Sequence, residues 1–180
     1  LIDAFEAKIL KALAALKIGD PMDPTTDMGP LHREEDATKL WSQVQAAIKS
    51  GDKLVSGEAP KDAFFKPAVL RVGKPNASVL MKEELFGPVF SLVAFNTEEE
   101  AIKLANQTQY GLGATLVTKD LEKGEALGRR IEAGQVFVNQ ALGTYSRMPS
   151  GGIKASGYGR DCGSHGVEAF ANIKTYYFKK

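Results

Sequence analysis

The chain is 180 residues long, 43% hydrophobic and 25% charged, which is the composition of a folded globular domain and excludes a disordered or fibrous protein. Its 23 Lys and Arg residues balance 22 Asp and Glu residues, and the two signs are mixed along the sequence, so the charge favours neither nucleic acid nor an anionic membrane as a partner. No stretch approaches the roughly 20 apolar residues of a membrane helix, and one cysteine with two separated histidines gives neither a disulfide nor a structural zinc site. We therefore expect one domain, without a metal, in the cytoplasm.

The N-terminal residues 1–16 are predicted to form an amphipathic helix. Apolar side chains recur on one face at helical spacing, at Phe5, Ile9, Leu13 and Leu16. No initiator methionine or capping residue precedes this helix, so we expect that Leu1 is not the native start of the protein. A loop rich in Pro, Gly and Asp follows over residues 19–30.

A second helix is predicted from Arg33 to Ser50, because acidic residues mark its start and Gly51 follows its last turn. Short β-prone runs come next, at residues 53–57 and 67–72. The apolar run Phe90–Phe95 is predicted to be a buried strand.

The second half of the chain alternates strands with helices. Thr97 and Glu100 form a capping box that predicts a helix to about Asn106, and Asp120 is predicted to cap a helix over 121–132. Apolar runs at 113–117 and 135–139 are predicted to be strands. This alternation is typical of an α/β fold, in which a parallel sheet is covered by helices.

The segment 150–166 is rich in glycine and holds the only cysteine, Cys162, three residues before His165. A thiol nucleophile beside its base is one interpretation, because an imidazole can lower a thiol pKa or accept its proton. The glycines argue against a helix that would bring the two side chains together, and a neighbouring Asp161 carboxylate would raise the thiol pKa. An incidental pair is the simpler interpretation, with a short helix expected only at 167–171. The aromatic end of the chain is predicted to be an edge strand that lacks a partner.

Two carboxylates in "MKEELFGPVFSL" (residues 81–92) precede a Phe-Gly-Pro turn that leads into the predicted strand. This would place Glu83 and Glu84 at the rim of the sheet, where α/β domains bind ligands. Judged from spacing alone, a solvated acidic pair remains the simpler alternative.

Several segments share their order and spacing with one enzyme family: "LKIGDPMDPTTDMGPL", "EELFGPV", "ANQTQYGLGATLVTKD", "GQVFVN" and "GGIKASGYGRDCGSHGVEAF" with its closing "IKTYYF". Together they resemble the catalytic half of NAD(P)-dependent aldehyde dehydrogenases, and most of all the bacterial succinate-semialdehyde dehydrogenases. The resemblance implies oxidation of an aldehyde to an acid. In the family, a cysteine thiolate forms a thiohemiacetal, hydride passes to the nicotinamide, and a glutamate activates the hydrolytic water.

The resemblance assigns roles to four residues of this chain. Glu84 matches the glutamate that holds the nicotinamide ribose hydroxyls, and Phe86 matches the aromatic residue beside the nicotinamide. The segment from Gln140 to Ser150 matches the wall of the substrate tunnel. There Ser150 replaces a phenylalanine that many members carry, and Arg147 could pair with a substrate carboxylate, although a solvated arginine is the simpler alternative.

The resemblance also implies what lies elsewhere. It predicts a catalytic domain over about 1–165, an oligomerisation strand over about 170–180, and a nucleophile, a general base and a dinucleotide-binding domain upstream of Leu1. We therefore expect no catalytic residue here, an inactive isolated chain, and a homo-oligomer completed by the missing N-terminal half. NAD and NADP both stay open as cofactors. The alternative is a non-enzymatic binding or assembly module that keeps the scaffold.

Overall fold

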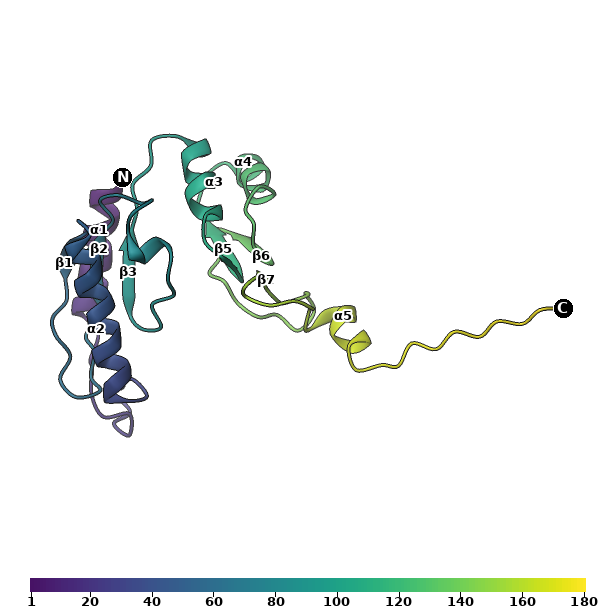
Figure 1. Ribbon diagram of the computed structural model, residues 1–180, viewed down its shortest axis with the longest axis horizontal. Coiled ribbons are helices and arrows are strands. Elements are labelled where there is room, and N and C mark those ends of the chain that lie inside the picture. The colour runs from purple at the N-terminus through teal and green to yellow at the C-terminus, as the bar shows by residue number, and fades with distance from the viewer. The chain divides into compact units, whose positions relative to one another are not determined.

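The computed structural model describes residues 1–180 and divides them into two compact units, residues 1–96 and 97–180, which are described separately (Figure 1). Unit 1 contains α1 (Ile2–Ala14), α2 (Glu34–Lys49), β1 (Lys53–Ser56), β2 (Ala68–Arg71), η1 (Val79–Met81) and β3 (Val89–Leu92). Unit 2 contains α3 (Glu98–Asn106), β4 (Tyr110–Gly111), β5 (Gly113–Leu116), α4 (Leu121–Gly128), β6 (Gln135–Val138), β7 (Ile153–Lys154) and α5 (Gly163–Glu168). The predicted α/β class is confirmed. None of the helices combines the length and apolar character required to cross a bilayer.

Unit 1 is built around a three-stranded sheet in the order β1-β2-β3, with β1 antiparallel and β3 parallel to the central β2. Leu70 of β2 packs in one core cluster with residues of α2 such as Leu40 and Val44. Side chains alternate along a strand, so Val69 and Arg71 face the opposite side. There Val69 is fully buried and the Arg71 guanidinium pairs with carboxylates of α1, so the two helices flank the sheet (Figure 1).

Unit 2 has two small sheets and no comparable core. β5 pairs in parallel with β6, and β4 pairs antiparallel with β7. Helix α4 approaches β6 closely through glycine, since a Cβ on Gly124 would lie 3.0 Å from a methyl carbon of Val138. All of the chain's buried hydrophobic side chains lie in unit 1. Backbone pairing and polar contacts therefore carry a larger share of the structure of unit 2.

The segment between β6 and β7 is held by backbone contacts. The N–H of Ser150 donates to the carbonyl of Asp161 at 2.8 Å, and the N–H of Asp161 donates back at 2.7 Å. The Arg160 guanidinium donates to the carbonyl of Gly152 at 2.9 Å. The backbone of Gly134 packs directly against that of Gly151, since a Cβ on Gly134 would lie 1.9 Å from the Gly151 carbonyl oxygen.

The sheets differ from the prediction. The single parallel sheet expected in the second half is wrong, because β3 pairs with β2 and leaves β5 and β6 as an isolated parallel pair. The strand predicted as buried over 90–95 spans only Val89–Leu92, and Phe90 is 42% exposed because β3 lies at the edge of its sheet. Residues 169–180, where an edge strand was expected, form no strand, and no strand of the chain pairs with them.

The predicted helices of the first half lie where expected, within one or two residues at most ends. Helix α4 stops at Gly128, earlier than predicted, and the turn after it is closed by the N–H of Ile131 on the carbonyl of Gly128 at 3.1 Å. Helix α5 covers the glycine-rich residues 163–168 rather than 167–171, so the expectation that these glycines prevent a helix is wrong.

Candidate functional site

The loop that carries the predicted cofactor residues begins at η1. The Ser78 hydroxyl caps this short helix by accepting the N–H of Leu80 at 3.1 Å, and the N–H of Glu83 donates to the carbonyl of Val79 at 2.9 Å. Beyond the acidic pair, a Cβ on Gly87 would lie 2.3 Å from a methyl carbon of Leu40 on α2. Glycine lets the turn press against the helix here, since any Cβ would have to push the Leu40 side chain aside.

Glu84 and Phe86 line one cavity of unit 1, with a volume of about 390 Å³. Helix α2 and the residues before it supply the rest of the lining: Leu31, His32, Asp36, Lys39, Leu40 and Gln43. The structure therefore brings the two predicted cofactor residues together. The Phe86 side chain is 86% exposed, and no ring of the chain packs against it.

The cavity offers a mixed set of chemical groups. A carboxylate such as Glu84 accepts hydrogen bonds from hydroxyl groups, the Lys39 ammonium is a donor, and the exposed Phe86 ring can cover a flat apolar group. At the rim, the Gln43 amide donates to the Glu83 carboxylate at 3.0 Å and so ties α2 to the acidic loop. The cavity can take a ligand that combines hydroxyl groups with a planar ring.

Sequence reasoning missed the contribution of α2 to this cavity. Asp36, Lys39 and Gln43 lie on the polar side of an amphipathic helix, a position that indicates solvent exposure when the sequence is considered alone. The apolar residues on the opposite face of α2 were a possible signal. They indicate that the helix packs on the sheet, which places the borders of its polar face next to the neighbouring loop.

The two predicted substrate residues lie in unit 2, between β6 and β7. Ser150 is half-buried, and both of its backbone groups pair with Asp161. Arg147 is exposed, and its guanidinium makes no hydrogen bond or ion pair within the chain. The structure brings no partner to Arg147, which leaves its five donors free for a ligand.

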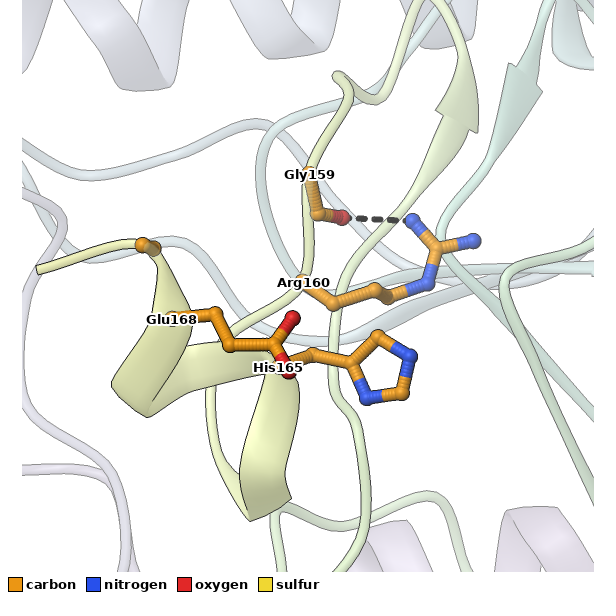
Figure 2. Close-up of a pocket in the computed structure, with 5 residues that line it drawn as sticks. Gly159, Arg160, His165 and Glu168 are labelled. Carbon is orange, nitrogen blue, oxygen red and sulfur yellow. Dashed lines mark hydrogen bonds between the residues drawn. The ribbon is translucent and has the colours of Figure 1, made fainter. Parts of the chain in front are cut away.

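Cys162 and His165 do not form a catalytic pair in this structure. Cys162 precedes the six-residue α5 and is a free thiol, and the His165 ring has the Ser164 hydroxyl, not the thiol, at 3.4 Å from its Nδ1. His165 instead lines a second cavity of about 380 Å³ with Glu168 and Arg160 (Figure 2). Figure 2 shows the Arg160 guanidinium bonded to the carbonyl of Gly159, a distance of 2.6 Å. No group of three or more His, Cys, Asp or Glu side chains could hold a metal ion.

Both the sequence and the fold are similar to those of known proteins. The model of the aldehyde dehydrogenase family matches residues 1–176, and the chain therefore belongs to this family. It is 39% identical over 179 residues to a succinate-semialdehyde dehydrogenase (NADP(+)) of Mycolicibacterium paratuberculosis, an alignment that covers 98% of this chain and 38% of that protein. It is also 39% identical to succinate-semialdehyde dehydrogenase (NADP(+)) 1 of Mycobacterium tuberculosis, over 98% of this chain and 39% of that protein. The chain thus spans less than half the length of these relatives.

Solved structures agree with this assignment. Succinic semialdehyde dehydrogenase from Streptococcus pyogenes in complex with NADP+ superposes with a TM-score of 0.92 at 34% identity, over 99% of this chain and 40% of that one. A Mycobacterium tuberculosis aldehyde dehydrogenase complexed with NAD+ gives a TM-score of 0.86 at 33% identity, over 94% of this chain and 36% of that one. The resemblance found in the sequence motifs is confirmed.

Proposed function

We propose that this chain is the C-terminal catalytic-domain portion of an NAD(P)-dependent aldehyde dehydrogenase that oxidises an aldehyde to a carboxylic acid. Succinate semialdehyde is the first candidate substrate, because relatives at 38–39% identity carry that name. The observation that carries the proposal is the cavity that unites Glu84 and Phe86 in a chain of this family.

The cavity suits NAD or NADP, which would supply a hydride acceptor to the reaction. Glu84 would accept hydrogen bonds from the nicotinamide ribose hydroxyls, and bonds to a charged acceptor contribute about 1.5 to 3 kcal/mol each. Phe86 would pack beside the nicotinamide, and its exposed ring has no competing partner within the chain. Solved relatives contain NADP+ or NAD+, so both forms remain candidates.

Replacement of Glu84 tests the cofactor proposal in the full-length gene product. Glu84→Gln removes the charge and keeps the shape, so we expect the KM for NAD(P) to rise about tenfold. Steady-state kinetics with the cofactor as the varied substrate would measure the change. Glu58→Gln is a matched control, since the Glu58 carboxylate pairs with Lys66 on the surface and lines no part of the cavity. An unchanged cofactor KM in Glu84→Gln would contradict the proposal.

We further propose that residues 1–165 belong to the catalytic domain and residues 170–180 to the oligomerisation strand of a longer enzyme. The dinucleotide-binding domain, the nucleophile and the general base would then lie outside this sequence. The length of the relatives supports this division. The isolated 180-residue chain should produce no NAD(P)H from any aldehyde, and steady NAD(P)H production by the purified chain would refute this part of the proposal.

Arg147 and Ser150 are proposed to face the substrate. A guanidinium can bind a carboxylate through two parallel hydrogen bonds, which suits a semialdehyde that carries one. In the full-length product, Arg147→Ala should lower kcat/KM for succinate semialdehyde about tenfold while an uncharged aldehyde of similar length is little affected. An equal effect on both aldehydes would contradict a carboxylate-specific role.

The proposed enzyme is a cytoplasmic homo-oligomer. Its single thiol is free, as is usual in a reducing compartment. Apolar and aromatic side chains near the C-terminus, including Ile173 and Phe178, are more than four-fifths exposed and are available to a second copy.

A further inference from the structure

Asp52 is a buried carboxylate at the junction between α2 and β1. It is 5% exposed, and with Ser78 it makes up the chain's buried polar residues. One carboxylate oxygen accepts the N–H of Gly73 at 3.0 Å, and the other accepts the hydroxyl of Ser78. A buried carboxylate is costly unless such donors satisfy it, so both bonds matter for the fold.

The Ser78 hydroxyl connects the Asp52 carboxylate to the start of η1 through two hydrogen bonds. Ser78 is 1% exposed, and its oxygen donates to Asp52 while it accepts the N–H of Leu80 at 3.1 Å. Because the hydroxyl must serve both partners, Asp52 sets its orientation and thereby the start of η1. The structure thus contains a continuous hydrogen-bonded path from a buried carboxylate to a helix start.

The far end of η1 leads directly to the proposed cofactor residue. The carbonyl of Val79 accepts the N–H groups of Lys82 at 3.0 Å and Glu83 at 2.9 Å. The side chain of Glu83 is held in turn by Gln43 of α2 at 3.0 Å. The backbone that leads to Glu84 is therefore held by two sets of contacts: the hydrogen-bonded path that starts at Asp52, and the hydrogen bond between Glu83 and Gln43 of α2.

We infer that Asp52 is a positioning residue for Glu84: through Ser78 and η1 it fixes the segment 79–84, and so the direction in which the Glu84 carboxylate meets the cofactor ribose. This inference rests on the cofactor role proposed for Glu84. It adds a residue remote in sequence, which contacts neither cofactor nor substrate and acts only through the path described.

Steady-state kinetics of the full-length product test the inference, because a positioning residue for Glu84 should affect the KM for NAD(P) and leave kcat unchanged. Asp52→Ala leaves the donors of Gly73 and Ser78 without their acceptor, and we expect the KM for NAD(P) to rise about fivefold with little change in kcat. Asp52→Asn keeps one acceptor oxygen, for Gly73 or for Ser78 but not for both, so its KM for NAD(P) should lie between those of the wild type and Asp52→Ala. Val69→Ala is the control for a general loss of stability, because Val69 is fully buried in β2 and takes no part in the path.

The possible results separate the inference from the proposed function. A rise of cofactor KM in Glu84→Gln but not in Asp52→Ala overturns the positioning role alone. An equal rise in Asp52→Ala and Val69→Ala also overturns it, since any loss of stability would then suffice. An unchanged KM in Glu84→Gln overturns the cofactor proposal itself.

Hydrogen exchange on the 180-residue chain gives a readout that is independent of catalysis. The amides of residues 80–84 should exchange faster in Asp52→Ala than in the wild type. In Val69→Ala, any faster exchange should extend over unit 1 and not be confined to these amides. If Asp52→Ala does not fold, Ser78→Ala takes its place, because it cuts the same path and should raise both the cofactor KM and the exchange of these amides. Normal KM and normal exchange in Ser78→Ala would overturn the inference.

Discussion

At the scale of single residues, the lone thiol attracts a catalytic interpretation that its surroundings do not support. Cys162 has a positive φ of 61°, immediately before the six-residue α5, and forms no hydrogen bond with His165. A thiol nucleophile needs its base within hydrogen-bond reach, and these two side chains form no such bond. The position of Cys162 is therefore that of a residue in a tight turn.

Replacement of Cys162 provides the corresponding prediction. In the full-length product, Cys162→Ser should leave kcat and KM for the aldehyde within about twofold of the wild type. The measurement is steady-state oxidation of succinate semialdehyde, with total enzyme determined by active-site titration. Loss of turnover would indicate that this thiol takes part in the chemistry after all.

The residues around the proposed cofactor cavity show which contacts can be predicted from the sequence and which cannot. Glu84 and Phe86 were predicted as cofactor residues because "EELFGPV" resembles a motif of the family, whereas spacing alone favoured a solvated acidic pair. Lys39 and Gln43 could not, because their contribution depends on how α2 docks against the loop, which involves contacts 40 residues apart such as Gln43 with Glu83. The polar face of a helix gives no indication of which loop will cover it.

At the scale of elements, local capping chemistry was the most predictable feature. The side chain of Thr97 accepts the N–H of Glu100 at 3.1 Å, and that of Asp120 accepts the N–H of Lys123 at 3.0 Å, as both cap predictions required. Caps depend on residues three positions apart, so the sequence contains all the information they need. Strand partners are chosen over long separations, which is why β3 was wrongly assigned to the sheet of the second half.

The ion pair between α3 and the turn that follows α4 gives a prediction about pH. The Arg130 guanidinium donates to Glu99 and holds the pKa of that carboxyl below its ordinary value. A carboxyl with a lowered folded-state pKa contributes stability above its unfolded pKa of about 4.3, and this contribution is lost as the pH falls through the folded pKa. The pair is exposed, so the contribution is small.

Carboxyl NMR titration of the 180-residue chain would measure this effect directly. The Glu99 resonance should titrate below the ordinary range of a glutamate in the wild type. In Arg130→Met the Glu99 midpoint should move up to its ordinary range. Identical midpoints in the wild type and the variant would disprove the proposed coupling.

At the scale of the whole chain, apolar burial is unevenly divided. Unit 1 contains every buried hydrophobic side chain, while unit 2 leaves Val117 85% and Phe170 93% exposed. Exposed apolar groups at this density favour association, because burial of apolar area contributes roughly 25 cal/mol per Å². The exposed apolar and aromatic side chains Ile173, Tyr176, Tyr177 and Phe178 add a segment that can pair with a strand from another chain.

Removal of that segment should change the assembly. Sedimentation of the 180-residue chain should reveal association that increases with concentration, and a chain that ends at Asn172 should associate less at the same concentration. Circular dichroism would establish that both chains keep the same helix content. Equal association of the two chains would assign the contact to other apolar surface of unit 2.

The close approach of Gly134 to Gly151 brings together two stretches that lie apart in the sequence. Even one methyl group at position 134 would overlap the carbonyl oxygen of residue 151, the neighbour of Ser150. The turn that follows α4 and the proposed wall of the substrate tunnel can therefore change only in concert. A redesign of selectivity in the proposed enzyme should therefore keep glycine at position 134 and vary the proposed wall at Arg147, which is exposed.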